Sequence, residues 1–69
     1  MYQQMIREEC VKQSHVGMNP KLIEAWMRLE HGCLDGLSNR QFADEVAIAI
    51  QLIKAEPEAS AKLAESYGL

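Results

Sequence analysis

With 69 residues, the chain is long enough for one small domain, because independent domains usually span about 50 to 250 residues. Its residues are 48% hydrophobic and 25% charged, with four Gly and two Pro, which excludes disordered and collagen-like classes and predicts a folded chain. Seven Lys and Arg against ten Asp and Glu give a net charge of -3, and no segment carries dense positive charge, which argues against nucleic acid as a partner.

The first predicted helix runs from Tyr2 to Ser14. Its apolar residues recur at helical spacings and share one face, which holds Tyr2, Met5, Ile6 and Cys10. Glu9 and Gln13 project within that same face. We therefore expect a helix that packs at the edge of the fold or requires a partner, followed by a linker over residues 15–18.

A second helix is predicted from Pro20 to His31. Asn19 can cap the free backbone N–H groups, and a proline at the first helical position loses no hydrogen bond. Gly32 stands where a left-handed residue would end the helix. One face of this helix is apolar and carries Leu22, Ala25, Trp26 and Leu29.

The third helix has the most specific local signal in the chain. Ser38 and Gln41 have the spacing of a capping box, and Leu37 and Phe42 flank it as a hydrophobic staple. The apolar pattern continues to the residues before Pro57. Because the connection between the second and third helices is short, we expect the two to form an antiparallel hairpin.

Pro57 opens a fourth segment, which Gly68 would end. The predicted fold class is all-α, a small bundle of three to four helices with a central antiparallel hairpin. The chain then forms one domain, divided into an N-terminal helix and linker (1–18), the hairpin (19–56) and a short C-terminal helix (57–69). The predicted core consists of Leu22, Trp26, Leu29, Phe42, Val46, Ile50 and Ile53.

Arg7, Glu8 and Glu9 interrupt the first apolar residues before an export signal develops. The longest apolar run, Val46 to Ile50, is far shorter than the roughly 18 residues that span a bilayer. We therefore expect a cytoplasmic protein that has no membrane segment and whose cysteines are reduced.

Four residues are of types that zinc favours: Cys10, His15, His31 and Cys33. Their spacing argues against a metal site, since Cys10 and His15 diverge by about 140° on a helix and the usual C-x-x-C or H-x-x-x-H repeats are missing. A nucleophile pair of Cys33 and His31 has no third residue to orient the imidazole. We predict no catalytic residue, metal or cofactor, and no enzyme.

The stretch Ser60 to Leu69, with Leu63 and the small Ala64 ahead of Gly68, resembles the first helix and turn of helix-turn-helix DNA-binding domains. This resemblance implies a partial DNA-associated protein. The recognition helix that would enter the major groove would begin where this sequence stops. An Ala-rich helix that docks on the core is the alternative interpretation, and the net negative charge favours it.

Some apolar residues lie off the predicted core faces. They are Ile23 and Met27 on the second helix and Ile48 and Leu52 on the third. Exposed apolar patches are unusual on soluble monomers, so these four residues predict an interface for a protein partner or a second copy of the chain. As an alternative, residues 35–69 hold six acids and three bases, which would suit an acidic inhibitor of a nucleic-acid-binding protein.

Overall fold

Local capping chemistry sets where the helices begin. In the computed structural model, which describes residues 2–69, the Asn19 side chain accepts a hydrogen bond from the Lys21 N–H, and Pro20 is the first residue of its helix. Ser38 and Gln41 form both hydrogen bonds of the predicted capping box. The described residues form four helices: α1 (Tyr2–Lys12), α2 (Pro20–His31), α3 (Asn39–Ala55) and α4 (Pro57–Ser66).

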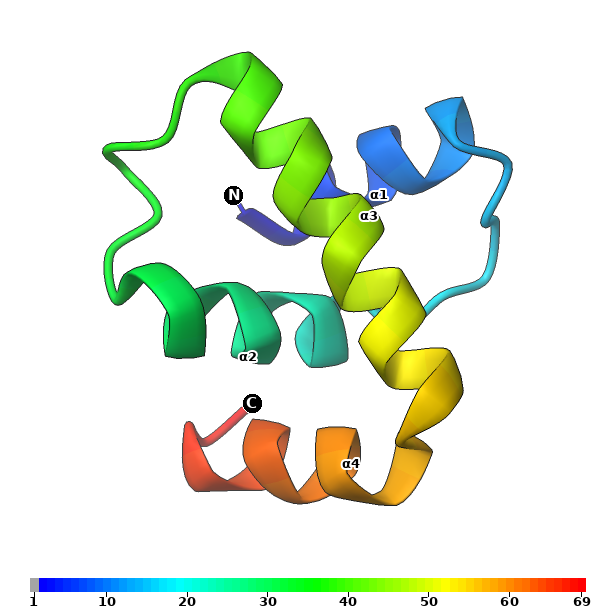
Figure 1. Cartoon of the computed structure of the whole chain (residues 1–69), viewed down its shortest axis with the longest axis vertical. Helices are drawn as coiled ribbons and strands as arrows, with labels where there is room; N and C mark the ends of the chain where they lie inside the picture. Colours follow the sequence, from blue (N-terminus) through cyan, green and yellow to red (C-terminus); the bar gives the residue numbers. More distant parts are fainter. Residues whose placement is uncertain (1) are drawn as a thin grey trace.

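The four helices pack around α2. It lies between α1 and α4, and α3 crosses it as the chain returns from the loop of residues 32–38 (Figure 1). α4 runs beside α2, whereas α1 and α4 do not contact each other. The prediction of an all-α fold, a small bundle of helices, is confirmed. The two central helices cross at a steep angle in Figure 1 and do not lie side by side as the antiparallel hairpin that we expected.

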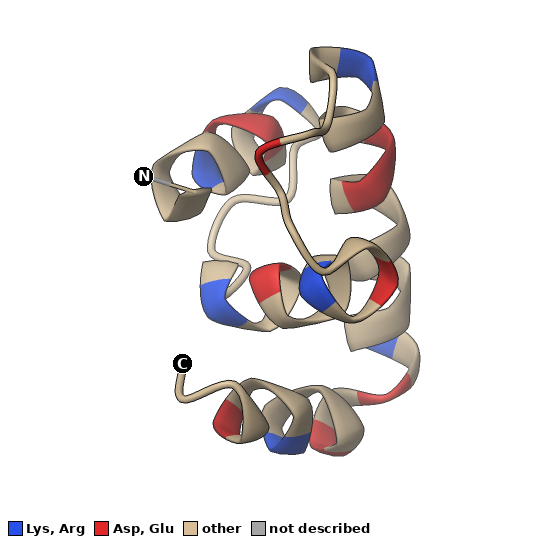
Figure 2. Cartoon of the chain, turned by 90° about the vertical axis from the view of Figure 1, so that its left-hand side faces the viewer, with Lys and Arg blue, Asp and Glu red and all other residues tan. Residues whose placement is uncertain are grey.

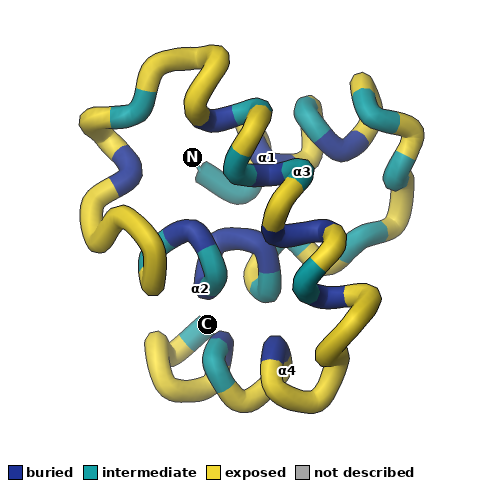
Figure 3. Tube along the Cα trace, viewed as in Figure 1, coloured by how far each residue is buried: buried dark blue, intermediate teal, exposed yellow. Residues whose placement is uncertain are grey.

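The core lies where α1, α2 and α3 meet. Ten buried side chains form it: Ile6, Cys10, Ile23, Met27, Leu34, Phe42, Val46, Ala49, Ile50 and Ile53. α4 is buried only along the edge that faces α2, through Ser60 and Ala64 (Figure 3). Trp26 joins the two helices, because its indole N–H donates to the Ser60 hydroxyl at 2.8 Å.

The predicted orientation of α2 is wrong. Ile23 and Met27, which we expected on the surface, are 0% and 1% exposed, whereas Leu29, expected in the core, is 56% exposed. Leu22 and Trp26 are half-buried against the core. The reason is that α2 contacts all three other helices. Trp26 of the predicted face bonds to Ser60 of α4, whereas Ile23 and Met27 join the core cluster with residues of α1 and α3.

The ends of α1 and α2 depart in detail from the sequence prediction. α1 ends at Lys12, and Ser14, which we placed in the helix, has a φ of 60° beyond it. Gly32 has φ 72° and ψ -63°, and the Cys33 N–H donates to the carbonyl of His31 at 2.8 Å. This is a γ-turn and not the left-handed helical cap that we expected.

Candidate functional site

A shallow groove separates the C-terminal half of α2 from the middle of α3. Its volume is about 100 Å³, and we call it the α2–α3 groove. It is lined by Trp26, Met27, Leu29, Glu30, Glu45, Ile48, Ala49 and Leu52. The groove is smaller than the roughly 300 to 1,000 Å³ of sites for small molecules or cofactors, and it has room for an aliphatic side chain.

Three of the four predicted interface residues meet in this groove. Ile48 is 52% exposed on one wall, Leu52 is half-buried beside it, and the buried Met27 contributes to the lining from α2. Ile23 lies in the core and does not take part. Leu29, the exposed residue of the opposite wall, is absent from the predicted interface because it shares a helical face with Trp26.

The charges around the groove are acidic. Glu30 and Glu45 line it, and Glu45 Oε1 lies 3.1 Å from His31 Nε2, which links α2 to α3. At 100° per residue, the two bases of α3, Arg40 and Lys54, are rotated from Ile48 by about 80° and 120°. The groove is therefore an apolar surface with carboxylates at its rim.

Elsewhere the charges of the two signs alternate along the helices. Each helix carries both basic and acidic residues, and the view in Figure 2 contains no broad basic face. On α4, Lys62 lies between Glu58 and Glu65. Such a surface offers no concentrated site for phosphates.

The four cysteine and histidine residues weighed as metal ligands are spread over the molecule. Within residues 2–69, no group of three or more His, Cys, Asp or Glu side chains is close enough together to hold a metal ion. Cys10 is buried on α1, and burial raises the pKa of its thiol. The exposed Cys33 donates to Asp35 Oδ2 at a sulfur–oxygen distance of 3.8 Å, and His31 is paired with Glu45.

A second polar contact connects the start of α1 with the loop between α2 and α3. The Tyr2 hydroxyl donates to Asp35 Oδ1, and this hydrogen bond raises the pKa of the phenol from 10.0 to about 12. Asp35 thus accepts hydrogen bonds from both Tyr2 and Cys33. The hydrogen bond from Tyr2 thus ties the loop of residues 32–38 to the start of α1.

Comparison of the chain with protein-family models, curated proteins and solved structures gives no match. No helix within residues 2–69 combines the length and the apolar character needed to cross a bilayer.

Proposed function

We propose that this protein acts by binding another protein through the α2–α3 groove, without catalysis. One observation carries the proposal: Leu29 and Ile48 expose more than half of their surface on opposite walls of a hollow with acidic groups at its rim. Groups of exposed apolar residues with a polar surround are typical of protein-binding surfaces. Two helices with a groove between them can receive a third helix through its apolar face.

The charges indicate the chemistry of the partner. Glu30 and Glu45 favour a helix whose apolar residues are flanked by Lys or Arg, since complementary charges speed and orient association. A symmetric contact between two copies of this chain, centred on the groove, would instead bring Glu45 of one copy towards Glu45 of the other, and their like charges would oppose the contact. We therefore infer a basic amphipathic helix of another protein as the occupant.

A titration followed by fluorescence tests this proposal. Trp26 is the sole tryptophan and lines the groove. Two designed helical peptides share one leucine face and carry either Lys or Glu on the remaining positions. The Lys peptide should change the Trp26 emission and bind at least about tenfold more tightly than the Glu peptide, a difference of about 1.4 kcal/mol.

Matched variants distinguish binding of the Lys peptide in the groove from its general attraction to an acidic protein. Ile48→Ser should weaken binding of the Lys peptide about fivefold or more, whereas Val11→Ser, at a valine of α1 that is even more exposed, should not. Glu30→Gln should weaken it more than Glu58→Gln, which removes the same charge from α4. Equal effects within either pair would contradict the proposal.

Light scattering of the free protein tests the alternative occupant. We expect the monomer mass of 7.8 kDa at all concentrations. A dimer that Ile48→Ser dissociates would assign the groove to a second copy of the chain and overturn the proposed partner.

The acidic inhibitor predicted from the sequence is a special case of this function. It applies if the basic helix belongs to the nucleic-acid-binding surface of the partner. In that case an oligonucleotide should compete with this protein for the partner, and the competition should weaken as salt is raised. The helix-turn-helix alternative has less support, because the exposed charges of α4 are mainly acidic.

A further inference from the structure

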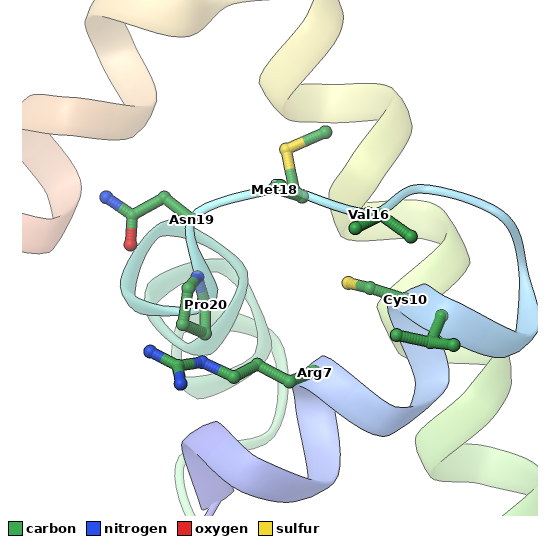
Figure 4. A pocket seen from close by; sticks show the side chains of 8 residues that line it. Arg7, Cys10, Val16, Met18, Asn19 and Pro20 are labelled. Atoms are coloured by element: carbon green, nitrogen blue, oxygen red, sulfur yellow. The ribbon is translucent and has the colours of Figure 1, made fainter.

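The two most exposed large apolar residues of the described chain lie on the rim of a second hollow. Val11 and Val16 are 61% and 78% exposed, and both line a pocket of about 420 Å³ between α1 and the linker that leads to α2. We call it the α1–linker pocket. Its other lining residues are Arg7, Cys10, Gly17, Met18, Asn19 and Pro20 (Figure 4).

The linker is fixed at both ends, which preforms the pocket. After α1, the N–H of His15 donates to the carbonyl of Cys10 at 2.7 Å. Gly17 then adopts a φ of 94°, which turns the chain back. Met18 packs against the core, and Asn19 caps α2.

Arg7 is the one charged residue among those that line the pocket. Within residues 2–69, no carboxylate lies within ion-pair distance of its guanidinium. In Figure 4 this guanidinium is directed towards Pro20, whereas the sulfur of Cys10 points into the space between Val16 and Pro20. The pocket therefore combines an apolar wall with a single cation at its edge.

We propose that the α1–linker pocket binds a small carboxylic acid with an apolar tail, its tail against Val11, Val16 and Pro20 and its carboxylate on Arg7. The volume falls within the range of small-molecule sites, about 300 to 1,000 Å³. Arg pairs with carboxylates through two parallel hydrogen bonds.

The surroundings of Arg7 favour a carboxylate over a phosphate. Pro20 has no N–H, and the N–H of Lys21 is already bonded to Asn19 Oδ1. The Leu22 N–H also donates to Asn19, through its carbonyl at 3.2 Å, so the first three residues of α2 offer no free N–H of the kind with which helix N-termini bind phosphates. One cation matches the single charge of a carboxylate.

The two cysteines provide the experiment. Cys10 lines the pocket and is 3% exposed, whereas Cys33 is exposed on the loop after α2 and acts as an internal control. Octanoate is the probe, and alkylation of each thiol by a maleimide is followed by mass spectrometry of peptides. At ten times its dissociation constant, measured by calorimetry, octanoate should slow the alkylation of Cys10 about tenfold and leave Cys33 unchanged.

Two comparisons make the result specific. Octanol, which has the same tail without the charge, should protect Cys10 much less than octanoate. Arg7→Gln should remove this preference, whereas Lys12→Gln, which removes a charge from the next turn of α1, should keep it. Failure of octanoate to bind or to protect Cys10, equal protection by octanol, or an equal effect of the two variants would overturn the proposal. None of these outcomes bears on the α2–α3 groove.

Discussion

At the scale of single residues, Tyr2 makes the free energy of unfolding depend on pH in the alkaline range. The hydrogen bond to Asp35 is the largest cause that raises the pKa of the phenol from 10.0 to about 12. The folded chain therefore holds this proton more tightly than the unfolded chain, so the contribution of Tyr2 is complete below pH 10 and is lost as the pH rises through 12.

Replacing Tyr2 by Phe tests this linkage. Wild type should be more stable than Tyr2→Phe at neutral pH, and the difference in free energy of unfolding should shrink between pH 10 and pH 12. Urea titrations at a series of pH values give this difference. Tyr67→Phe is the control, since its hydroxyl has no hydrogen bond to another side chain in residues 2–69. A difference that stays constant through this range would contradict the assignment.

At this scale, the sequence predicts contacts between neighbouring residues but not contacts between residues far apart in the chain. The caps at Asn19 and Ser38 were predicted because each involves atoms within three residues of the cap. Gly32 was predicted to end α2, but its γ-turn depends on where the following loop is held. The Tyr2–Asp35 contact that holds this loop joins residues 33 positions apart, and no local pattern could predict it.

At the scale of helices, the contact between α2 and α4 depends on one buried hydroxyl. Ser60 is 0% exposed, accepts from the Trp26 indole at 2.8 Å and donates to the carbonyl of Glu56 at 2.7 Å. Ser60→Ala leaves the indole N–H without this acceptor. We expect a loss of about 1 to 2 kcal/mol in the free energy of unfolding, measured with urea by Trp26 fluorescence and far-ultraviolet circular dichroism.

Ser66→Ala is the matched control for Ser60→Ala. The Ser66 hydroxyl also donates to a backbone carbonyl, that of Leu63, but it is exposed at the end of α4. Its loss should change stability by less than about 0.5 kcal/mol. Equal effects of the two substitutions would mean that the bond between Trp26 and Ser60 does not hold α4 on α2.

The helices also explain why only part of the candidate site was predicted. α3 has a dominant buried face, so Ile48 and Leu52 were correctly placed away from its centre. α2 is packed against all three other helices, and a helical wheel cannot say which of its apolar faces each neighbour covers. This is why Ile23 and Met27 were placed outside and Leu29 inside.

At the scale of the whole molecule, α2 determines where apolar surface remains. Its contacts with α1, α3 and α4 bury the middle of the helix, while the α2–α3 groove lies between its exposed C-terminal end and α3. The α1–linker pocket lies at the other end of α2, beside Pro20. One central helix thus supports the core and borders both candidate sites.

A chain of this length has a stability of only about 3 to 10 kcal/mol, at roughly 0.05 to 0.15 kcal/mol per residue. Two isoleucines of α3 have different roles: one stabilises the fold, and the other is exposed in the proposed binding groove. Ile50 is 0% exposed in the core, whereas Ile48, two positions earlier, is 52% exposed in the groove. Ile50→Ala should cost about 2 to 5 kcal/mol, enough to unfold a large share of the molecules near the lower limit of stability.

Ile48→Ala should show the opposite pattern. Half of its side chain is already in contact with solvent, so the loss of stability should stay below about 1 kcal/mol. Its binding to the Lys peptide should weaken as for Ile48→Ser, because an anchor at the centre of an interface is removed. Urea unfolding and the Trp26 titration, applied to the same two variants, measure both effects. If Ile48→Ala destabilised the fold as much as Ile50→Ala, Ile48 would be a core residue and the groove would lose its exposed wall.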